Sequence, residues 1–501
     1  MNNPVKVLVT SKKKLQFKYG NNFSALEKLF KTLITADAKK SLDTKLIYID
    51  DDASAKAAGI KATKLINEKT CKKAIDDISK KHTPAYIMIV GAQDVIPFQC
   101  IINPAGDDGD AEVESDLPYA CESAYSSSIN DFTGPTRVVG RLPDLPGVQK
   151  NISYFTTLIN NIIKQKPAAA TKYNSQYFAI STSVWKKSTA MTLQSVFNSH
   201  EMLLLSPSGK PDKPFTKGEL KPLIHFYNCH GAKVDPGYYG QKGKNFPTAI
   251  ASTALAKNIA YGTVIAAECC YGAQLYDSSD LKNINSIAST YLQYGAVTFM
   301  GSTTIAYGPS DSNSLADLMT RYFIESILNG ASAGRALLEA RQKFLSESGP
   351  QLDPYELKTL AQFLLLGDPS VQPVMSEESA ESKTMIGGSV QNNRMRLASK
   401  GINLANTISP SVKTNANQVS ANEEELNNIL RKAKFDGAND KGVFAVKANK
   451  SLTGIEKKIT DSHILFRTYI KKKKNNRNDF QVLVVKENKD QILGWRMYES
   501  K

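Results

Sequence analysis

The chain has 501 residues, of which 41% are hydrophobic, and a formal net charge of +15. This length exceeds what one compact core usually holds and predicts two to four domains. No stretch approaches the roughly 18 uninterrupted apolar residues that cross a bilayer, so we expect no membrane span. Because the lysines are scattered, the charge favours a solvated basic surface over a nucleic-acid or lipid site.

The first half of the chain alternates short apolar runs with amphipathic stretches. From the start to about residue 165, strand-like runs such as VKVLVT, AYIMIVG and TRVVGR alternate with helix-like ones such as FSALEKLFKTLITA. From about 166 to 375 the runs QYFAIST, PLIHFYN, TVIAAE and AVTFMG precede two long helical patterns. Such alternation predicts an α/β fold with a parallel sheet and crossover helices, in two tandem subdomains, 1–165 and 166–375.

The composition changes at about residue 376. Residues 376–434 are rich in Ser, Asn, Glu and Lys, and only EEELNNILRKA has apolar periodicity, so we expect a polar linker with one short helix. From 435 to 501, runs such as HILFRTYI and DFQVLVVKE alternate as half-buried strands do. We expect a small β-rich basic domain there, which could bind a regulatory partner.

Two of the expected strands end in residues that can carry chemistry. The strand at 223–228 is followed by Cys229, His230 and Gly231, and the strand at 263–268 is followed by Cys270. Because ligands of open α/β sheets bind at the carboxyl ends of the strands, we expect His230 and Cys270 to meet at one edge.

A thiol beside an imidazole is suited to nucleophilic catalysis. The imidazole generates the thiolate that attacks a carbonyl, and the imidazolium can then protonate the leaving amine. We therefore expect Cys270 to be the nucleophile and His230 the general acid and base. The backbone N–H groups of Gly231 and Cys270 are expected to stabilise the oxyanion.

These residues carry a resemblance to known enzymes. A strand ending in His-Gly, followed by one ending in ECCYG, resembles the pattern of caspase-like cysteine peptidases. Glu268 takes the Gln place of the caspase signature, Cys269 the small-residue place and Cys270 that of the nucleophile. Cys269 is then a small, inward-facing filler.

The wider chain resembles the gingipain family. AYIMIVGAQDVIPF, ESDLPYA, TRVVGRLP, HFYNCHGA, GAVTFMGST and FLLLGDPSVQP are similar to family landmarks in the family's order, over about residues 85–375. The resemblance implies a caspase-like parallel-sheet sandwich in two tandem subdomains. It also implies cysteine endopeptidase activity on a protein or peptide substrate, through a thioester and without a cofactor.

The expected location departs from the family. Known members are typically secreted with signal and pro-segments, and neither is evident here. The first residues lack the basic start and long apolar stretch of a signal peptide, and the six cysteines show no regular spacing. We expect a reducing, cytoplasmic location.

The expected specificity departs from the family too. In gingipains that cut after Arg or Lys, the resemblance places an acid at the floor of the primary pocket. The matching stretch, 181–192, has no acid and offers Lys186 and Lys187. An Arg or Lys side chain buried there would lose water without gaining a counter-charge, so we expect cleavage after Arg or Lys not to be preferred and an acidic or neutral residue to be. Glu268 is a further possible pocket residue. The alternative is that both lysines point to solvent and another loop builds the pocket.

Other interpretations stay open at this point. The chain could be a catalytically inactive α/β scaffold whose basic C-terminal domain binds an anionic partner. A nucleic-acid module is disfavoured because the tail lacks interleaved aromatic residues and glycines. A zinc site at Cys229, His230, Cys269 and Cys270 is disfavoured by geometry. His225 is expected in the core, segment 237–243 as an active-site loop, and Asp94 and Asp116 as structural or cation-binding acids.

Overall fold

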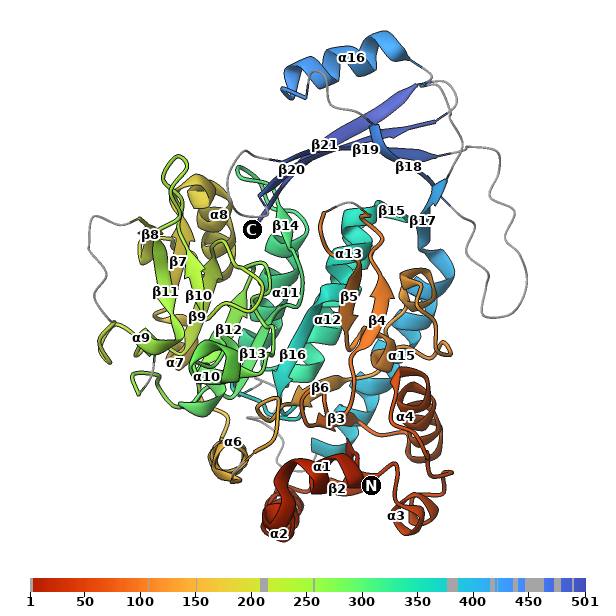
Figure 1. Ribbon diagram of the computed structural model, residues 1–501, viewed down its shortest axis with the longest axis vertical. Helices are drawn as coiled ribbons and strands as arrows, with labels where there is room; N and C mark the ends of the chain where they lie inside the picture. The colour runs from red at the N-terminus through yellow and green to blue at the C-terminus, as the bar shows by residue number, and fades with distance from the viewer. Residues whose placement is uncertain are drawn as a thin grey trace.

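The computed structural model describes residues 3–501 except 107, 150, 208–214, 256, 376–385, 415–419, 421, 436–439, 447–463, 473–478 and 489–490. Its centre is a ten-stranded sheet (Figure 1). In spatial order the strands are β2 (Asp43–Tyr48), β1 (Val5–Thr10), β3 (Tyr86–Val90), β6 (Val139–Leu142), β16 (Phe363–Gly367), β13 (Thr298–Ser302), β12 (Val264–Ala267), β9 (Ile224–Asn228), β7 (Phe178–Thr182) and β8 (Leu203–Ser206).

The sheet consists of two parallel halves that run in opposite directions. Strands β2, β1, β3, β6 and β16 are mutually parallel, as are β13, β12, β9, β7 and β8. The halves meet where β16 pairs antiparallel with β13. The expected α/β class with a large, mainly parallel sheet is therefore confirmed.

Helices cover both faces of this sheet. As a result, every position of β9, β12, β13 and β16 is buried. One connected group consists of α8 (Lys186–Phe197), α11 (Ala316–Leu328) and α12 (Ala333–Ser348). A second consists of α2 (Phe23–Ala38), α6 (Ser153–Lys164) and α10 (Ile287–Gln293). None of the helices among the described residues is both long and apolar enough to traverse a lipid bilayer.

Shorter elements complete this part of the chain. They are α1 (Lys12–Tyr19), α3 (Asp52–Ala57), α4 (Glu68–His82), β4 (Gln99–Ile102), β5 (Glu112–Ser115), α5 (Leu117–Ala120), α7 (Thr171–Asn174), β10 (Gly237–Tyr239), β11 (Thr248–Ala251), α9 (Ser252–Leu255), β14 (Tyr307–Gly308), β15 (Gln351–Leu352) and α13 (Pro354–Gln362).

A buried ion pair joins the beginning of the sheet to its middle. The Lys6 ammonium in β1 lies 2.7 Å from Asp368, directly after β16, and 2.5 Å from Asp37 in α2. Burial lowers the pKa of Lys6, but the two carboxylates outweigh it and raise that pKa above its ordinary value. The Gly-Asp-Pro turn at 367–369 thus anchors β1.

The C-terminal residues form a second, curved sheet above the first (Figure 1). Its order is β14, β21 (Ile492–Ser500), β20 (Phe480–Glu487), β19 (Leu465–Lys472), β18 (Asp440–Val446), β17 (Ser409–Thr414) and β15. Both edge strands, β14 and β15, belong to the α/β part of the chain. The expected mainly-β C-terminal part is therefore present, and it is hydrogen-bonded at both edges to the rest of the protein.

The segment 376–434, expected to be a linker with one short helix, contains more regular structure. Helix α16 (Glu423–Lys432) is the expected one, but α15 (Ile386–Thr407) and β17 were not predicted. Buried Leu397 and Leu404 are seven positions apart on α15, so its apolar pattern is too sparse to recognise. Residues 376–385 of the expected linker lie outside the described residues. The bounds of the expected domains stay a prediction.

Candidate active site

His230 and Cys270 line one cavity of about 210 Å³. Strands β9 and β12 are parallel neighbours with Tyr227 opposite Ala267, so the segments that follow them emerge side by side. The other lining residues are Gly231, Ala232, Lys233, Phe246, Tyr271, Ile305, Asp479 and Lys501. The two residues expected to form the catalytic pair are therefore brought together at the predicted edge.

The His230 ring is held by the segment expected to be an active-site loop. Nε2 of His230 lies 2.9 Å from Oε1 of Gln241, and the His230 backbone pairs with Tyr239 at 2.9 and 2.8 Å. The rings of Trp185 and Phe246 pack on the imidazole, with centroid distances of 4.4 and 4.9 Å. Segment 237–243 thus lies beside His230, and Gln241 and Trp185 orient its ring.

The Cys270 thiol is enclosed. Only 3% of Cys270 is exposed, and its Sγ lies 3.6 Å from the backbone oxygen of Ala306. Burial raises the pKa of the Cys270 thiol to about 12, so this enclosed state holds the thiol and not the thiolate. Cys269 is fully buried, and burial raises its pKa well above the ordinary value, as suits a packing residue.

Gly231 allows the two strand ends to approach closely. A Cβ at position 231 would lie 1.8 Å from the Cys270 carbonyl oxygen, so no other residue fits without a shift of the backbone. This contact places Gly231 directly against the Cys270 backbone. The donor role expected of the Gly231 N–H stays a prediction.

The last residue of the sequence, Lys501, lies in this cavity. The Cys270 N–H donates to the Lys501 carbonyl oxygen at 2.9 Å, and the Lys501 N–H donates to Ala306 at 2.9 Å. The preceding residues pair antiparallel with β14, with Ser500 opposite Tyr307 and Glu499 opposite Gly308. Strand β21 therefore reaches the cavity as an extended peptide added to β14.

The Lys501 side chain fills an acidic pocket. Its ammonium lies 2.8 Å from Asp317 Oδ1 and 3.0 Å from Glu268 Oε2, and all three side chains are fully buried. The Thr320 hydroxyl donates to the other Glu268 oxygen at 2.9 Å, and the ammonium lies 5.2 Å from the centre of the Trp185 ring. These groups recognise a primary ammonium at the end of an extended side chain.

The ionisation of this pocket follows from burial and charge. Burial and the Asp317 carboxylate raise the pKa of Glu268 to about 8, against the opposing effect of Lys501. Burial lowers the pKa of Lys501, but the Asp317 and Glu268 carboxylates outweigh it and raise that pKa above its ordinary value. The lysine is therefore held as a cation.

The residues expected from the sequence to line the substrate pocket lie in different places. Lys186 and Lys187 are exposed at the start of α8, and their neighbour Trp185 is the residue that packs against His230. Glu268, named from the sequence as a possible pocket residue, and Asp317 face the Lys501 ammonium. The expectation that cleavage after Arg or Lys is not preferred stays a prediction. Asp317 was missed, although a carboxylate within the otherwise apolar pattern LADLMTRYF was a signal for a buried charge.

The other residues considered from the sequence have structural partners. His225 is fully buried between Tyr291 Oη at 2.6 Å and the Pro222 oxygen at 3.0 Å, and burial lowers its pKa to about 3. Asp94 pairs with Lys18 at 2.8 Å. Asp116 accepts two hydrogen bonds from Arg141, at 2.9 and 2.6 Å. Within the described ranges no group of three or more His, Cys, Asp or Glu could hold a metal ion.

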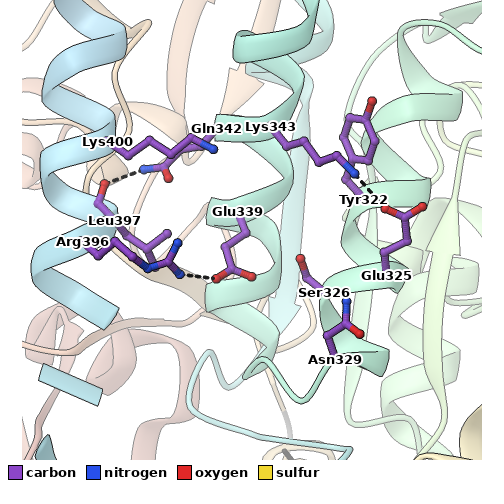
Figure 2. A pocket seen from close by; sticks show the side chains of 10 residues that line it. All are labelled: Tyr322, Glu325, Ser326, Asn329, Glu339, Gln342, Lys343, Arg396, Leu397 and Lys400. Atoms are coloured by element: carbon purple, nitrogen blue, oxygen red, sulfur yellow. Dashed lines mark hydrogen bonds and ion pairs between the residues drawn. The ribbon is translucent and has the colours of Figure 1, made fainter. Parts of the chain in front are cut away.

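A second hollow, of about 320 Å³, lies between α11, α12 and α15 (Figure 2). Its charged side chains point toward one another: Lys343 lies 3.0 Å from Glu325, and Arg396 lies 3.4 Å from Glu339. The lining residues include no cysteine and no histidine. We therefore place the chemistry at the smaller cavity around Cys270.

Comparison with known proteins identifies the family. The family model of Peptidase family C25 matches residues 2–374. The chain belongs to Peptidase family C25. This confirms the resemblance to the gingipain family and the caspase-like fold class, and it supports cysteine peptidase activity in general.

Solved structures give a weaker similarity. Two crystal structures of the Saccharomyces cerevisiae separase–securin complex, at 3.0 and 2.6 Å resolution, match with 13% and 12% identity and TM-scores of 0.31 and 0.30. The matches cover 56% and 58% of this chain but only 15% and 17% of the other chain. This chain thus spans a small part of those proteins. No curated protein matches.

Proposed function

We propose that the protein is a cysteine endopeptidase that cleaves on the carboxyl side of lysine through a Cys270 thioester. The observation that carries this proposal is the way Lys501 is held. Its carbonyl oxygen accepts from the Cys270 N–H at 2.9 Å, while its ammonium lies between the buried carboxyl groups of Asp317 and Glu268. A substrate residue before a scissile bond needs the same two interactions.

The proposed chemistry starts with proton transfer from Cys270 to His230. The thiolate then attacks the carbonyl carbon, and the Cys270 N–H donates to the oxyanion, with the Gly231 N–H as the expected second donor. Imidazolium protonates the departing amine as the C–N bond breaks, which leaves the thioester. Water, deprotonated by His230, then attacks the thioester, and the thiol is regenerated with a carboxylate product.

The pocket favours lysine among the basic residues. A Cβ at Gly308 would lie 2.3 Å from Lys501 Cε and 2.5 Å from Asp317 Oδ2, so the wall there is in close contact with the lysine stem. A guanidinium is longer and planar, and it must fit five N–H donors where one ammonium now fits. We expect arginine to be accepted less well than lysine.

A fluorogenic peptide series that varies only the residue before the scissile bond tests the proposal. We expect the highest kcat/KM with Lys, a lower value with Arg, and little turnover with Glu or norleucine. A matched experiment uses a peptide electrophile with Lys at that position, with the labelled residue mapped by mass spectrometry. Lack of both turnover and Cys270 labelling in the full chain and in Lys501→Ala would favour the inactive scaffold.

We also propose a reducing, cytoplasmic location for the enzyme. All six cysteines are free thiols, and five of them are buried. Cell fractionation with an antibody against the protein would test this, and recovery only from the culture medium would contradict it.

A further inference from the structure

We propose that strand β21 is a built-in inhibitor of the peptidase, in which Lys501 occupies the place of the substrate lysine. This inference rests on the proposed function, because it identifies what competes with substrate for the same site. Three features of the described residues support it: the backbone pairing of the strand, its side-chain anchors and the burial of Cys270 and His230.

The backbone of β21 uses the hydrogen bonds that a peptide substrate would need. Lys501 bonds to Cys270 and Ala306, each at 2.9 Å, and the two residues before it pair with Tyr307 and Gly308 of β14. Strand addition to an exposed edge is a common mode of peptide recognition. While β21 is in place, a second peptide cannot add to this edge of β14.

Side chains hold β21 in this position along its length. The Trp185 ring N–H donates to Glu499 at 3.1 Å, so Trp185 contacts both Glu499 and the Lys501 ammonium. Further from the cavity, Arg496 lies 2.6 Å from Glu356 in α13. In addition, the Tyr498 hydroxyl donates to Asp353, directly before α13, at 3.1 Å.

The proposed catalytic residues are buried while β21 is in place. Lys501 is 1% exposed, Cys270 3% and His230 6%, so the pair has little access to solvent or substrate. Because β21 belongs to the same chain, its effective concentration at the site reaches at least the millimolar range of a short flexible tether. A peptide substrate of similar affinity must be present above this effective concentration to displace β21. The enzyme is therefore inhibited until β21 leaves the site.

Alkylation of Cys270 tests the inference without depending on catalysis. The rate of labelling by iodoacetamide, mapped by mass spectrometry, is compared in the full-length protein and in Lys501→Ala. Loss of the ammonium leaves the buried Asp317 carboxylate without its cation, so β21 should leave the pocket and the rate should rise at least about tenfold. The labelling rate of Lys501→Arg should be closer to that of the unchanged protein, because arginine keeps a positive charge at this position.

Two controls separate displacement from unfolding. Lys432→Ala changes an exposed lysine of α16 in the same C-terminal part and should leave labelling unchanged. A synthetic peptide with the sequence of residues 492–501 should slow labelling of Lys501→Ala, which an unfolded protein could not show. Circular dichroism confirms that each variant is folded.

The outcomes distinguish this inference from the proposed function. Faster labelling with faster hydrolysis of a Lys substrate supports both. Faster, peptide-protectable labelling with no hydrolysis supports the inference and contradicts the proposed function. Equal labelling in the full-length protein and in Lys501→Ala, with both folded, would overturn the inference, as would the absence of protection by the peptide.

Discussion

The Asp317 carboxylate should determine the preference for lysine, and Asp317→Asn tests this. Its Oδ1 lies 2.8 Å from the Lys501 ammonium, and both side chains are fully buried. At an effective dielectric constant of about 20, two unit charges at this distance attract by roughly 6 kcal/mol. Desolvation offsets part of this, and the amide keeps a hydrogen bond, so we expect a loss of about 3 kcal/mol. At about 1.36 kcal/mol for each tenfold change, this is roughly a hundredfold in kcat/KM.

The assay uses the Lys501→Ala protein, in which the pocket is free, with paired Lys and norleucine substrates. Norleucine keeps the aliphatic stem of lysine but lacks its ammonium. Asp317→Asn should lower kcat/KM for the Lys substrate and leave the norleucine value within a few-fold. Glu325→Gln, an acid on the same helix that pairs with Lys343, is the control and should change neither. An unchanged ratio of Lys to norleucine turnover in Asp317→Asn would refute the assignment of the pocket.

Three further predictions concern single residues of the site. Cys270→Ala should abolish turnover, whereas Cys269→Ala should retain turnover with some loss of stability. Equal loss of turnover from both changes would contradict the assignment of Cys270 as the nucleophile. Because the pKa of Glu268 is raised to about 8 from an ordinary 4.5, the folded protein should lose stability as pH rises between these values, and thermal unfolding of Glu268→Gln should show a flatter pH dependence. Gly308→Ala should raise KM for Lys substrates at least about tenfold, because its Cβ would lie 2.3 Å from Cε of a lysine held as Lys501 is; an unchanged KM would show that the lysine stem lies elsewhere.

The sequence predicts that His230 and Cys270 meet at one sheet edge because the decisive information is local. His230 and Cys270 each follow a buried strand, and parallel strands end at the same sheet edge. Strands β9 and β12 are indeed parallel neighbours. The glycine after the histidine also has a local reason, since its Cβ would collide with the Cys270 backbone. For such features, residue type and position within one strand are sufficient.

The acidic pocket around the Lys501 ammonium could not be predicted in this way. Asp317 lies 47 positions after Cys270 (317 minus 270), on a helix whose placement depends on packing against α12 and α8. Lys501 lies far beyond both and reaches the pocket only because β21 pairs with β14. Lys186 and Lys187 are exposed while the adjacent Trp185 is buried, because adjacent residues on a helix point in different directions.

The position of strand β16 in the sequence determines when the large sheet can form during synthesis. This strand joins the two halves of the large sheet, so all ten strands exist once residue 367 has been made. Lys501 follows 134 residues later (501 minus 367), which takes roughly 7 to 27 s at about 5 to 20 residues per second. A nascent chain therefore has every strand of its large sheet before β21, the proposed inhibitory strand, has been synthesised.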